Sequence, residues 1–511
     1  MERGRPGPDG QDVRFVGIAG VAHIARDHLQ ARLAPKEPAP DPLDAAVRLG
    51  AVADVDPHLG VLRHQADRAL AIARIQQLEE RIHGVDGSHA RQCTRHHPRM
   101  PSDLARHWQL DPSITFLNHG SFGACPAPVL AAQREWQDRL EREPVRFLAR
   151  ELDGHLGDVR EAIGGFVGAD PDDLALIANA TGGVNAVLRS LRFEPGDEIV
   201  TTDHEYNAVL NVVRHVAARD GAVPRIVALP FPDVEAEDIV RRLVGAVTPR
   251  TRLAVVSHVT SPTALVLPIE RIVAAVSGLG VDVLVDGAHA PGIIPLDLDR
   301  LGAAYYAANL HKWVCAPKGA AFLHVRRDRQ AAIRPATISH GANARDRGGS
   351  RFRLEFDWQG TLDPSAWLAA TAAVEFVGGL VAGGWPAVMS RTHDLAIAAG
   401  TRLAAALVRA GAPARGMAPM SMLGSMVALP LPPTGPLGGP ADPSQSSPLD
   451  ADPLQTILFD RYGIEVPIYG WPVPAVEAPD RVIRLIRISA ALHNDEADFD
   501  RLVEALDKVA A

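Results

Sequence analysis

The chain has 511 residues, a hydrophobic fraction of 47% and a formal net charge of −9. Its length allows a large core and more than one domain. The negative balance gives no reason to expect a nucleic-acid partner, which needs a basic face or stripe. Three widely spaced cysteines without a CxxC pair indicate neither a disulfide framework nor a thiolate zinc site, so we predict no metal site and a cytoplasmic location.

Residues 1–99 differ in composition from the rest of the chain. They are rich in arginine, histidine, proline and alanine, and only Ala66–Ile82 has a helical pattern. They contain no apolar stretch followed by a small-residue cleavage site, so no signal peptide is predicted. Met100 is the only methionine between Met1 and Met389. We predict a poorly ordered extension, which a mis-called start codon would explain; peptides from residues 1–99 of the native protein would contradict that explanation.

From about residue 115, short apolar runs alternate with helical stretches, which is typical of an α/β domain with a mostly parallel sheet. The predicted strands are Leu174–Ile177, Glu198–Thr202, Arg225–Ala228, Arg252–His258, Val281–Val285, Ala304–Ala307 and Ala320–His324. The helices predicted between them are Gly183–Leu191, Asn207–Ala217, Val234–Val247 and Ile269–Ser277. In such a doubly wound fold, ligands bind beyond the carboxyl ends of the strands.

The C-terminal part predicts a smaller domain. Residues 430–456 are proline-rich and favour a surface loop, and the sequences RVIRLIRISAALHN and DEADFDRLVEALDKVAA then predict a strand and a closing amphipathic helix. The weakly polar run at 366–385 opens with Asp363-Pro364, an N-cap followed by proline, which favours a buried helix over a membrane span. We predict an N-terminal segment at 100–130, a large domain at 131–375 and a small domain at 376–511.

Lysine is rare in this chain. Of the 52 basic residues only four are lysines, namely Lys36, Lys312, Lys318 and Lys508. Lysine can lose its proton and attack a carbonyl, whereas the guanidinium of arginine stays charged. Lys312, in the segment ANLHKW, is therefore a candidate Schiff-base lysine, although a lysine on a solvated face is the alternative for this residue type alone.

Two further features fall where predicted strands end. The apolar run 281–285 is followed by Asp286. A buried acid there is costly unless it meets a cation, which a protonated ring nitrogen of a ligand would supply; alternatively, Asp286 caps the next turn. The run 174–177 leads through a small, glycine-containing turn into a helix, whose first amides can bind phosphate. Together with Lys312 they describe a cofactor with a ring nitrogen, a phosphate and an aldehyde, which is pyridoxal 5′-phosphate.

In order and spacing, these motifs resemble the class V aminotransferase family of fold type I pyridoxal-phosphate enzymes, and within it the isopenicillin N epimerase-like branch, over about residues 113–505. The resemblance implies a large domain with a mostly parallel seven-stranded sheet and a smaller α+β C-terminal domain. It places the aldimine lysine on Lys312 and the pyridinium partner on Asp286. It also implies that His289 contacts the phenolic oxygen and that Tyr206 covers the ring.

The same resemblance implies the remaining site residues. The phosphate contacts correspond to Ala180, Thr181, Gly182, Asn309 and His311, with Gly360-Thr361 reaching over from a neighbouring subunit. A homodimer with shared sites is therefore expected. The residues that correspond to the substrate site are Arg487, which would hold the carboxylate of an amino acid, and Asn118, His119 and Ser121.

The chemistry implied for this family begins at the α carbon, with Lys312 as general base and a quinonoid intermediate. We rank an epimerase first, with Tyr206 or His119 as the second proton carrier. A carbon–sulfur lyase of the selenocysteine lyase-like or hercynylcysteine sulfoxide lyase-like kind ranks second, and an aminotransferase third. A typical cysteine desulfurase is disfavoured because no cysteine occurs between Lys318 and Arg487. A non-catalytic scaffold with this fold is the alternative of another class.

Overall fold

The computed structural model describes residues 102–511 apart from 346–349, 415, 440–450 and 473–481. The predicted extension at 1–99, its helix at Ala66–Ile82 and the central part of the predicted loop at 430–456 lie outside the described residues.

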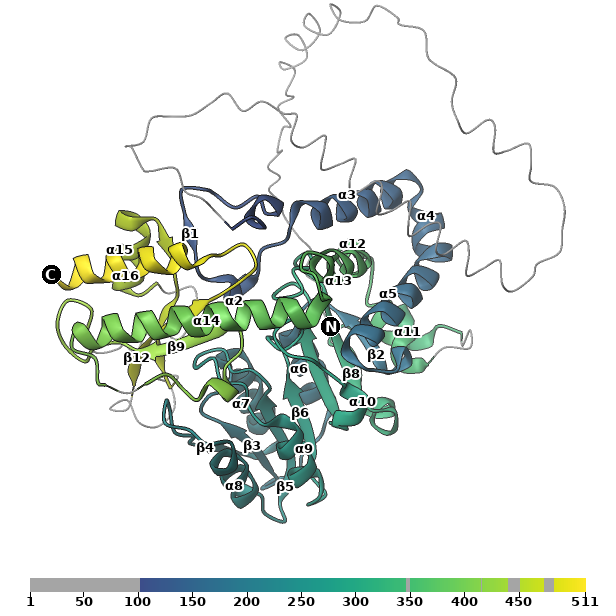
Figure 1. Ribbon diagram of the computed structural model, residues 1–511. Helices are drawn as coiled ribbons and strands as arrows, with labels where there is room; N and C mark the ends of the chain where they lie inside the picture. The colour runs from purple at the N-terminus through teal and green to yellow at the C-terminus, as the bar shows by residue number, and fades with distance from the viewer. Residues whose placement is uncertain (1–101, 346–349, 415, 440–450, 473–481) are drawn as a thin grey trace, which may run out of the picture. The chain divides into compact units, whose positions relative to one another are not determined.

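A seven-stranded sheet forms the large domain (Figure 1). The strands follow the order β2-β8-β7-β6-β5-β3-β4, and β8 alone runs antiparallel to its neighbours. Their bounds are β2 Leu174–Ile177, β3 Glu198–Thr202, β4 Val223–Val227, β5 Thr251–Ser257, β6 Asp282–Asp286, β7 Tyr305–Asn309 and β8 Ala321–Val325. The mostly parallel sheet is confirmed, and each predicted strand is present within two residues at either end.

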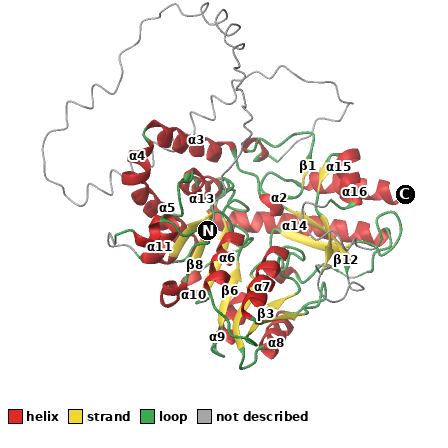
Figure 2. Ribbon diagram, turned by 180° about the vertical axis from the view of Figure 1, so that it is seen from behind, coloured by secondary structure: helices red, strands yellow, loops and turns green. Residues whose placement is uncertain are grey.

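Helices cover both faces of this sheet (Figures 1 and 2). The connecting helices are α6 Ala180–Ser190, α7 Asn207–Asp220, α8 Ala236–Ala246 and α9 Ile269–Ser277. Along β5, Ala254 and Val256 belong to the buried cluster that includes α8 and α9, whereas Leu253 and Val255 belong to the cluster that includes α6 and α7. Because successive side chains point to opposite faces, a strand buried on both faces is apolar throughout, as the sequence pattern indicated.

A second, three-stranded sheet has the order β11-β12-β9 and is antiparallel. Its strands are β9 Met426–Pro430, β11 Ile468–Trp471 and β12 Ile483–Ser489, and the nearby helices are α14 Gly384–Arg409, α15 Pro453–Tyr462 and α16 Glu496–Ala510. The predicted strand and closing helix correspond to β12 and α16, and a capping box between Asp495 and Asp498 begins that helix. Helix α15 begins at Pro453, within the last residues of the predicted loop at 430–456.

The N-terminal segment joins this second sheet region. Strand β1 (Thr115–Phe116) pairs in parallel with β10 (Ile464–Glu465). The other helices used below are α2 His119–Phe122, α3 Ala127–Arg142, α5 Leu152–Val167, α10 Leu298–Leu301, α11 Arg351–Asp357, α12 Ser365–Leu368 and α13 Ala370–Gly379. The site is therefore made from segments that lie far apart in the sequence.

The predicted helix start at Asp363-Pro364 needs one correction. Pro364 is itself the N-cap of α12, and Asp363 Oδ1 accepts a hydrogen bond of 2.8 Å from the Ser365 amide. All four residues of α12 are buried. Within the described residues, no single helix is long and apolar enough to cross a membrane, while the bent pair Ser365–Gly379 and Gly384–Arg409, at 69°, meets the length and composition criteria jointly.

Candidate active site

Lys312 follows β7, in the turn that leads to β8, and its Nζ lies 3.0 Å from Nε2 of His289. The other ring nitrogen of His289, Nδ1, accepts a hydrogen bond of 3.3 Å from Trp313 Nε1. Because an indole nitrogen only donates, Nδ1 carries no proton, and the proton of the neutral ring is on Nε2. Nε2 therefore donates to Lys312, whose amine accepts the bond and must be neutral.

The pKa values agree with this assignment. Burial lowers the pKa of His289 well below its usual value, and the nearby Lys312 acts in the same direction. Burial is also the main cause that lowers the pKa of the Lys312 ammonium to about 7; Arg487 adds to the shift and Asp286 opposes it. An amine that is neutral near pH 7 can serve as a nucleophile or as a general base.

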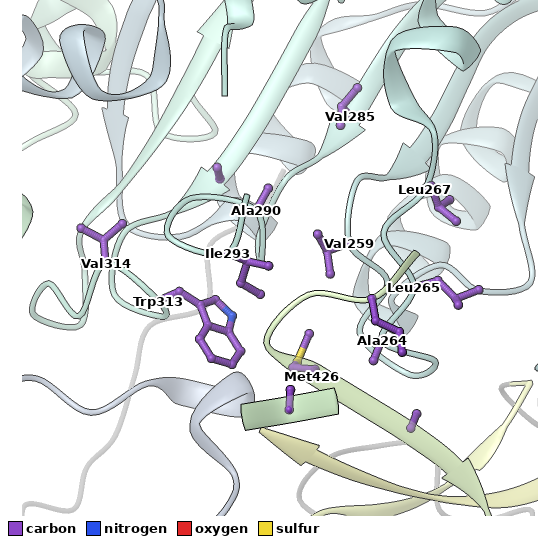
Figure 3. Packing of buried hydrophobic residues seen from close by; sticks show 14 of the residues in the cluster. Val259, Ala264, Leu265, Leu267, Val285, Ala290, Ile293, Trp313, Val314 and Met426 are labelled. Atoms are coloured by element: carbon purple, nitrogen blue, oxygen red, sulfur yellow. The ribbon is translucent and has the colours of Figure 1, made fainter. Parts of the chain in front are cut away.

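The turn that carries Lys312 is held from two sides. On one side, Trp313 belongs to the buried cluster that includes Met426 of β9 (Figure 3). On the other side, the residues after α2 pack directly on the turn: Gly123 has φ +69°, and a Cβ there would come within 2.1 Å of the turn's backbone. The lysine is therefore presented by a fixed backbone.

Asp286 ends β6, as predicted, and its side chain is buried. Its Oδ1 accepts a hydrogen bond of 2.9 Å from the Ala288 amide. Burial raises the pKa of this carboxyl, while the Ala288 amide and then Lys312 oppose the shift. Among the described residues, no Lys, Arg or His side chain lies within ion-pair distance of Asp286. A buried acid in this state is suited to a cation supplied by a ligand.

Glu205 is a second buried acid, which the sequence did not reveal as a site residue. Its Oε1 accepts hydrogen bonds from Ser257 Oγ and, at 3.0 Å, from the Tyr206 amide, whereas its Oε2 is buried without a partner. Burial raises its pKa to about 8, and the charge of Asp286 adds to the shift. The only signal in the sequence was an acid directly before Tyr206.

This pKa predicts a specific pH dependence of stability. Between the ordinary value of 4.5 and about 8, Glu205 is protonated in the folded protein but ionised in the unfolded chain. The folded state then binds one proton more, so stability falls as pH rises through this window, by about 1.4 kcal/mol per pH unit. The variant Glu205→Gln should lack this slope in denaturant unfolding of the cofactor-free protein. Equal slopes in both proteins would contradict the assignment.

The predicted phosphate turn lies at the N-terminus of α6, but part of its donor set is used within the chain. The Gly182 amide donates to Asn179 Oδ1 and the Ala180 amide donates to Asn309 Oδ1, both at 2.8 Å. Asn309 thus ties the end of β7 to the start of α6. Helix α6 packs so closely on β2 and β7 that position 183 needs a glycine: a Cβ there would lie 2.7 Å from the Ile177 side chain and 2.9 Å from that of Ala307.

Arg487 is buried in β12 and reaches toward the large domain. Its Nη1 donates to the carbonyl and the Oγ of Ser261, at 2.7 and 3.1 Å, and its Nη2 donates to Ser121 Oγ at 3.1 Å. The guanidinium lies 5.7 Å from the ring centroid of Tyr469, and its Nε is buried without a partner. No carboxylate of the described residues lies within ion-pair distance. A buried guanidinium without a counter-charge is costly, which indicates that a ligand carboxylate completes it.

The loop that carries Ser261 contains a strained residue. Ala264 is fully buried and has φ +58°, in the left-handed region. Because alanine there costs about 1–2 kcal/mol, Ala264→Gly should raise the free energy of unfolding by about 0.5–1 kcal/mol after the entropic cost of glycine. The control Ala290→Gly, buried but without a positive φ, should lower it by about 0.5–1 kcal/mol. A destabilised Ala264→Gly variant would contradict the strain.

Asn118 and His119 were predicted to lie near the substrate, but their side chains bond to other parts of the chain. Asn118 Nδ2 donates to Glu465 at 3.2 Å. His119 Nε2 is 3.0 Å from the Lys312 carbonyl, which can only accept, and Nδ1 is 3.2 Å from His493 Nε2. Burial lowers the pKa of His119 to about 4. Both ring nitrogens are thus engaged, and His119 supports the lysine turn.

The remaining predicted residues lie on four segments. Tyr206 is the partly buried N-cap of α7, and burial, and after it the charge of Asp286, raise the pKa of its hydroxyl. His311 Nδ1 lies 3.3 Å from the Ala320 carbonyl. Thr181 is partly buried in the first turn of α6. Gly360 and Thr361 lie between α11 and α12, with Thr361 exposed, and within one chain they touch none of these groups through a described hydrogen bond.

A doubly wound sheet with a lysine, a buried acid and a helix N-terminus at its strand ends is the arrangement of fold type I pyridoxal-phosphate enzymes. Residues 125–410 match the family described as "Aminotransferase class-V". The chain belongs to the class V aminotransferase family, and pyridoxal 5′-phosphate is the cofactor of this family.

The relatives agree with this membership. The chain is 34% identical over 424 residues to the probable L-cysteine desulfhydrase, chloroplastic, of Arabidopsis thaliana, covering 80% of this chain and 85% of the relative. It is 35% identical over 418 residues to the isopenicillin N epimerase of Amycolatopsis lactamdurans, covering 78% and 96%. The cysteine desulfurase of Thermococcus onnurineus NA1 shares the fold, with a TM-score of 0.64 at 18% identity over 81% of this chain and 98% of that one.

Proposed function

We propose that this protein is a pyridoxal-phosphate-dependent enzyme that removes the α proton of an amino acid, with Lys312 as the base. The observation that carries the proposal is the neutral amine of Lys312, which the Trp313–His289–Lys312 hydrogen-bond chain fixes. Asp286 would hold the ring nitrogen, and the first turn of α6 would hold the phosphate. When bound, the cofactor supplies an electron sink for the charge that forms at the α carbon.

The residues present fit this cofactor. The buried carboxyl of Asp286 lacks a cation among the described side chains, and the ring nitrogen is a cation when protonated. The Lys312 amine is neutral and can join a carbonyl carbon. The amides of Ala180 and Gly182 donate to asparagine side chains, so the phosphate contacts would come from Thr181 and from residues that give up or share those bonds.

The chain's own residues would divide the work as follows. Arg487, held by Ser261 and Ser121, binds the substrate carboxylate and so orients the α carbon. Lys312 would take the α proton, and the hydrogen bond from His289 would keep its amine able to accept that proton while the amine is free. Tyr206, close to Asp286, is our candidate for the second proton carrier, since both ring nitrogens of His119 bond within the protein.

We propose epimerisation of an amino acid as the first outcome, because inversion needs only Lys312 and a second proton carrier such as Tyr206. The test is incubation of the loaded enzyme with a panel of amino acids in deuterated water. Deuterium uptake with racemisation would support the proposal. Release of pyruvate with the yellow colour retained would support a lyase, and release of a keto acid with loss of the yellow colour would support transamination.

A carbon–sulfur lyase is the second candidate, because relatives at 30–34% identity are named L-cysteine desulfhydrases. A cysteine-based desulfurase is not proposed: no cysteine occurs between Lys318 and Arg487. Burial also raises the pKa of Cys315 and raises that of Cys125 to about 12, so neither is a ready thiolate. A loaded protein that exchanges no α proton of any amino acid would support a non-catalytic role instead.

We also propose a homodimer in which Gly360-Thr361 of each chain completes the other chain's phosphate site. The test is subunit complementation between Lys312→Ala and Thr361→Glu chains, each inactive alone. In the mixed dimer one site has both intact residues, so mixing should restore part of the exchange activity. If both residues acted within one chain, no activity would return.

A further inference from the structure

Three side chains with metal-ligand chemistry meet at the opposite end of the sheet strands from Lys312. They are Asp173 at the end of a short 3₁₀ turn (Pro171–Asp173), Asp299 in α10 and His324 in β8, and their ligand atoms all lie within 4.8 Å of one another. Figure 1 shows α10 next to β8 and β2. Nothing in the chemistry proposed above uses these residues.

The three segments are fixed to one another by backbone bonds. His324 is the strand partner of Leu174, which directly follows Asp173. The Asp299 amide donates to the Gly168 carbonyl at 2.9 Å, and the Asp170 amide donates to Asp299 Oδ2 at 3.1 Å. The side chains therefore meet on a prebuilt scaffold.

His324 is the member that points to a ligand. Its side chain is 4% exposed, and both ring nitrogens are buried without a hydrogen-bond partner. Its Nε2 lies 3.7 Å from Asp299 Oδ1, too far for a hydrogen bond. Leaving buried polar atoms unsatisfied is unfavourable, so the imidazole lacks something in the protein alone. Burial lowers the pKa of His324, and a neutral imidazole has a lone pair to donate.

The surrounding side chains carry negative charge that a divalent cation would neutralise. Five carboxylates lie on the two acidic segments, namely those of Asp170, Asp172, Asp173, Asp297 and Asp299. Three guanidiniums pair with them: Arg327 bonds to Asp170 and Asp173, Arg353 bonds to Asp172, and Arg300 lies 3.4 Å from Asp297. Among the described residues, no guanidinium lies within ion-pair distance of Asp299. The group therefore carries two more negative charges than positive ones.

We propose that Asp173, Asp299 and His324 bind a divalent transition-metal ion of the zinc class. One imidazole and two carboxylates, with water as a fourth ligand, suit Zn²⁺. Two ligands at about 2.1 Å from a tetrahedral metal lie roughly 3.4 Å apart, close to the 3.7 Å between His324 Nε2 and Asp299 Oδ1. Asp173 Oδ1 accepts from Arg327 and Gln330, which leaves Oδ2 for the metal.

The metal would act on structure rather than on chemistry. His324 is three residues along β8 from Ala321, the strand partner of Asn309, so it is separated from the lysine turn. Strand β2 lies at the edge of the sheet and runs from this cluster directly to Asn179 and the first turn of α6. A metal bound by this cluster would therefore hold β2, and with it the turn that leads into α6, in place.

The site is tested by titrating zinc into untagged, cofactor-loaded full-length protein. Calorimetry measures how many zinc ions bind, and thermal unfolding measures the Tm. Wild type should bind one zinc ion more than Asp299→Asn, and zinc should raise its Tm but not that of the variant. Asp299 is largely exposed, so this variant should fold. His324→Gln should lose the same ion.

Asp500→Asn is the matched control, because Asp500 is similarly exposed, at 56% against 54% for Asp299, and lies on α16. It should keep the wild-type stoichiometry and Tm rise. Equal zinc uptake by wild type and Asp299→Asn would overturn the proposal, as would a Tm rise that survives in both site variants. Neither result depends on which reaction the enzyme performs.

Discussion

Replacing Lys312 with alanine is expected to abolish the absorption band of the Schiff base between cofactor and protein, and to reduce α-proton exchange by at least 10²–10⁴-fold, the usual contribution of a general base alone. The amine is the only lysine nitrogen of the described residues that contacts His289. No neighbouring amine can take its place, because Lys318 Nζ donates instead to the Gly123 carbonyl at 2.9 Å. Absorption spectroscopy and deuterium exchange followed by NMR measure the two effects.

Lys318→Ala is the matched control for this change. It removes the other amine of the same turn and should keep both the colour and the exchange, with some loss of stability because Lys318 bonds across to the N-terminal segment. A Lys312→Ala protein that still showed the Schiff-base band of the wild type and still exchanged the α proton would remove the basis of the proposed function.

Replacing Arg487 with glutamine should reduce kcat/KM by about 30- to 5000-fold, because breaking a buried charge pair costs 2–5 kcal/mol. The loss should fall mainly on KM, since the substrate carboxylate is held in the ground state as well as in the transition state. The cofactor's colour should be unchanged. Steady-state kinetics with an amino acid and its amide measure the effect: the wild type should strongly prefer the acid, and the variant should discriminate little.

Arg484→Gln is the control on the same strand. Arg484 Nε donates to Asp452 at 2.8 Å, so its loss should lower stability without changing the preference for a free carboxylate. If Arg487→Gln retained the wild-type preference for the acid over the amide, Arg487 would be a structural residue and the carboxylate would bind elsewhere.

The strands of the large sheet could be predicted from the sequence because each one is marked by a short apolar run within the strand itself. Strands buried on both faces need continuous apolar runs, and the runs at Leu174–Ile177 and Glu198–Thr202 have the same bounds in the structure. Asp286 and Lys312 were also visible, since Asp286 ends one such run and Lys312 comes three residues after the end of another. The predicted domain bounds and the roles of the individual site residues stay predictions.

Contacts between distant segments could not be predicted in the same way. The charge state of Lys312 depends on His289 and on the Trp313 indole that faces it, and the unpartnered oxygen of Glu205 depends on how β5 packs. His119 has a suitable residue type for a substrate contact, yet its ring is held by His493 from the far end of the chain. The cluster around His324 joins three segments without any motif that links them.

The contact between α2 and β12 has a consequence for biosynthesis. The Gly120 amide bonds to Ser489 Oγ, a contact between residues 369 positions apart. At translation rates of about 5–20 residues per second, these partners emerge from the ribosome roughly 20–70 s apart. During that interval the segment around α2 can already contact the lysine turn, whose residues 311–318 are made earlier than β12, but its partner in the last strand is missing. Because Arg487 lies in that same strand, the proposed substrate site is incomplete until the last strand is synthesised.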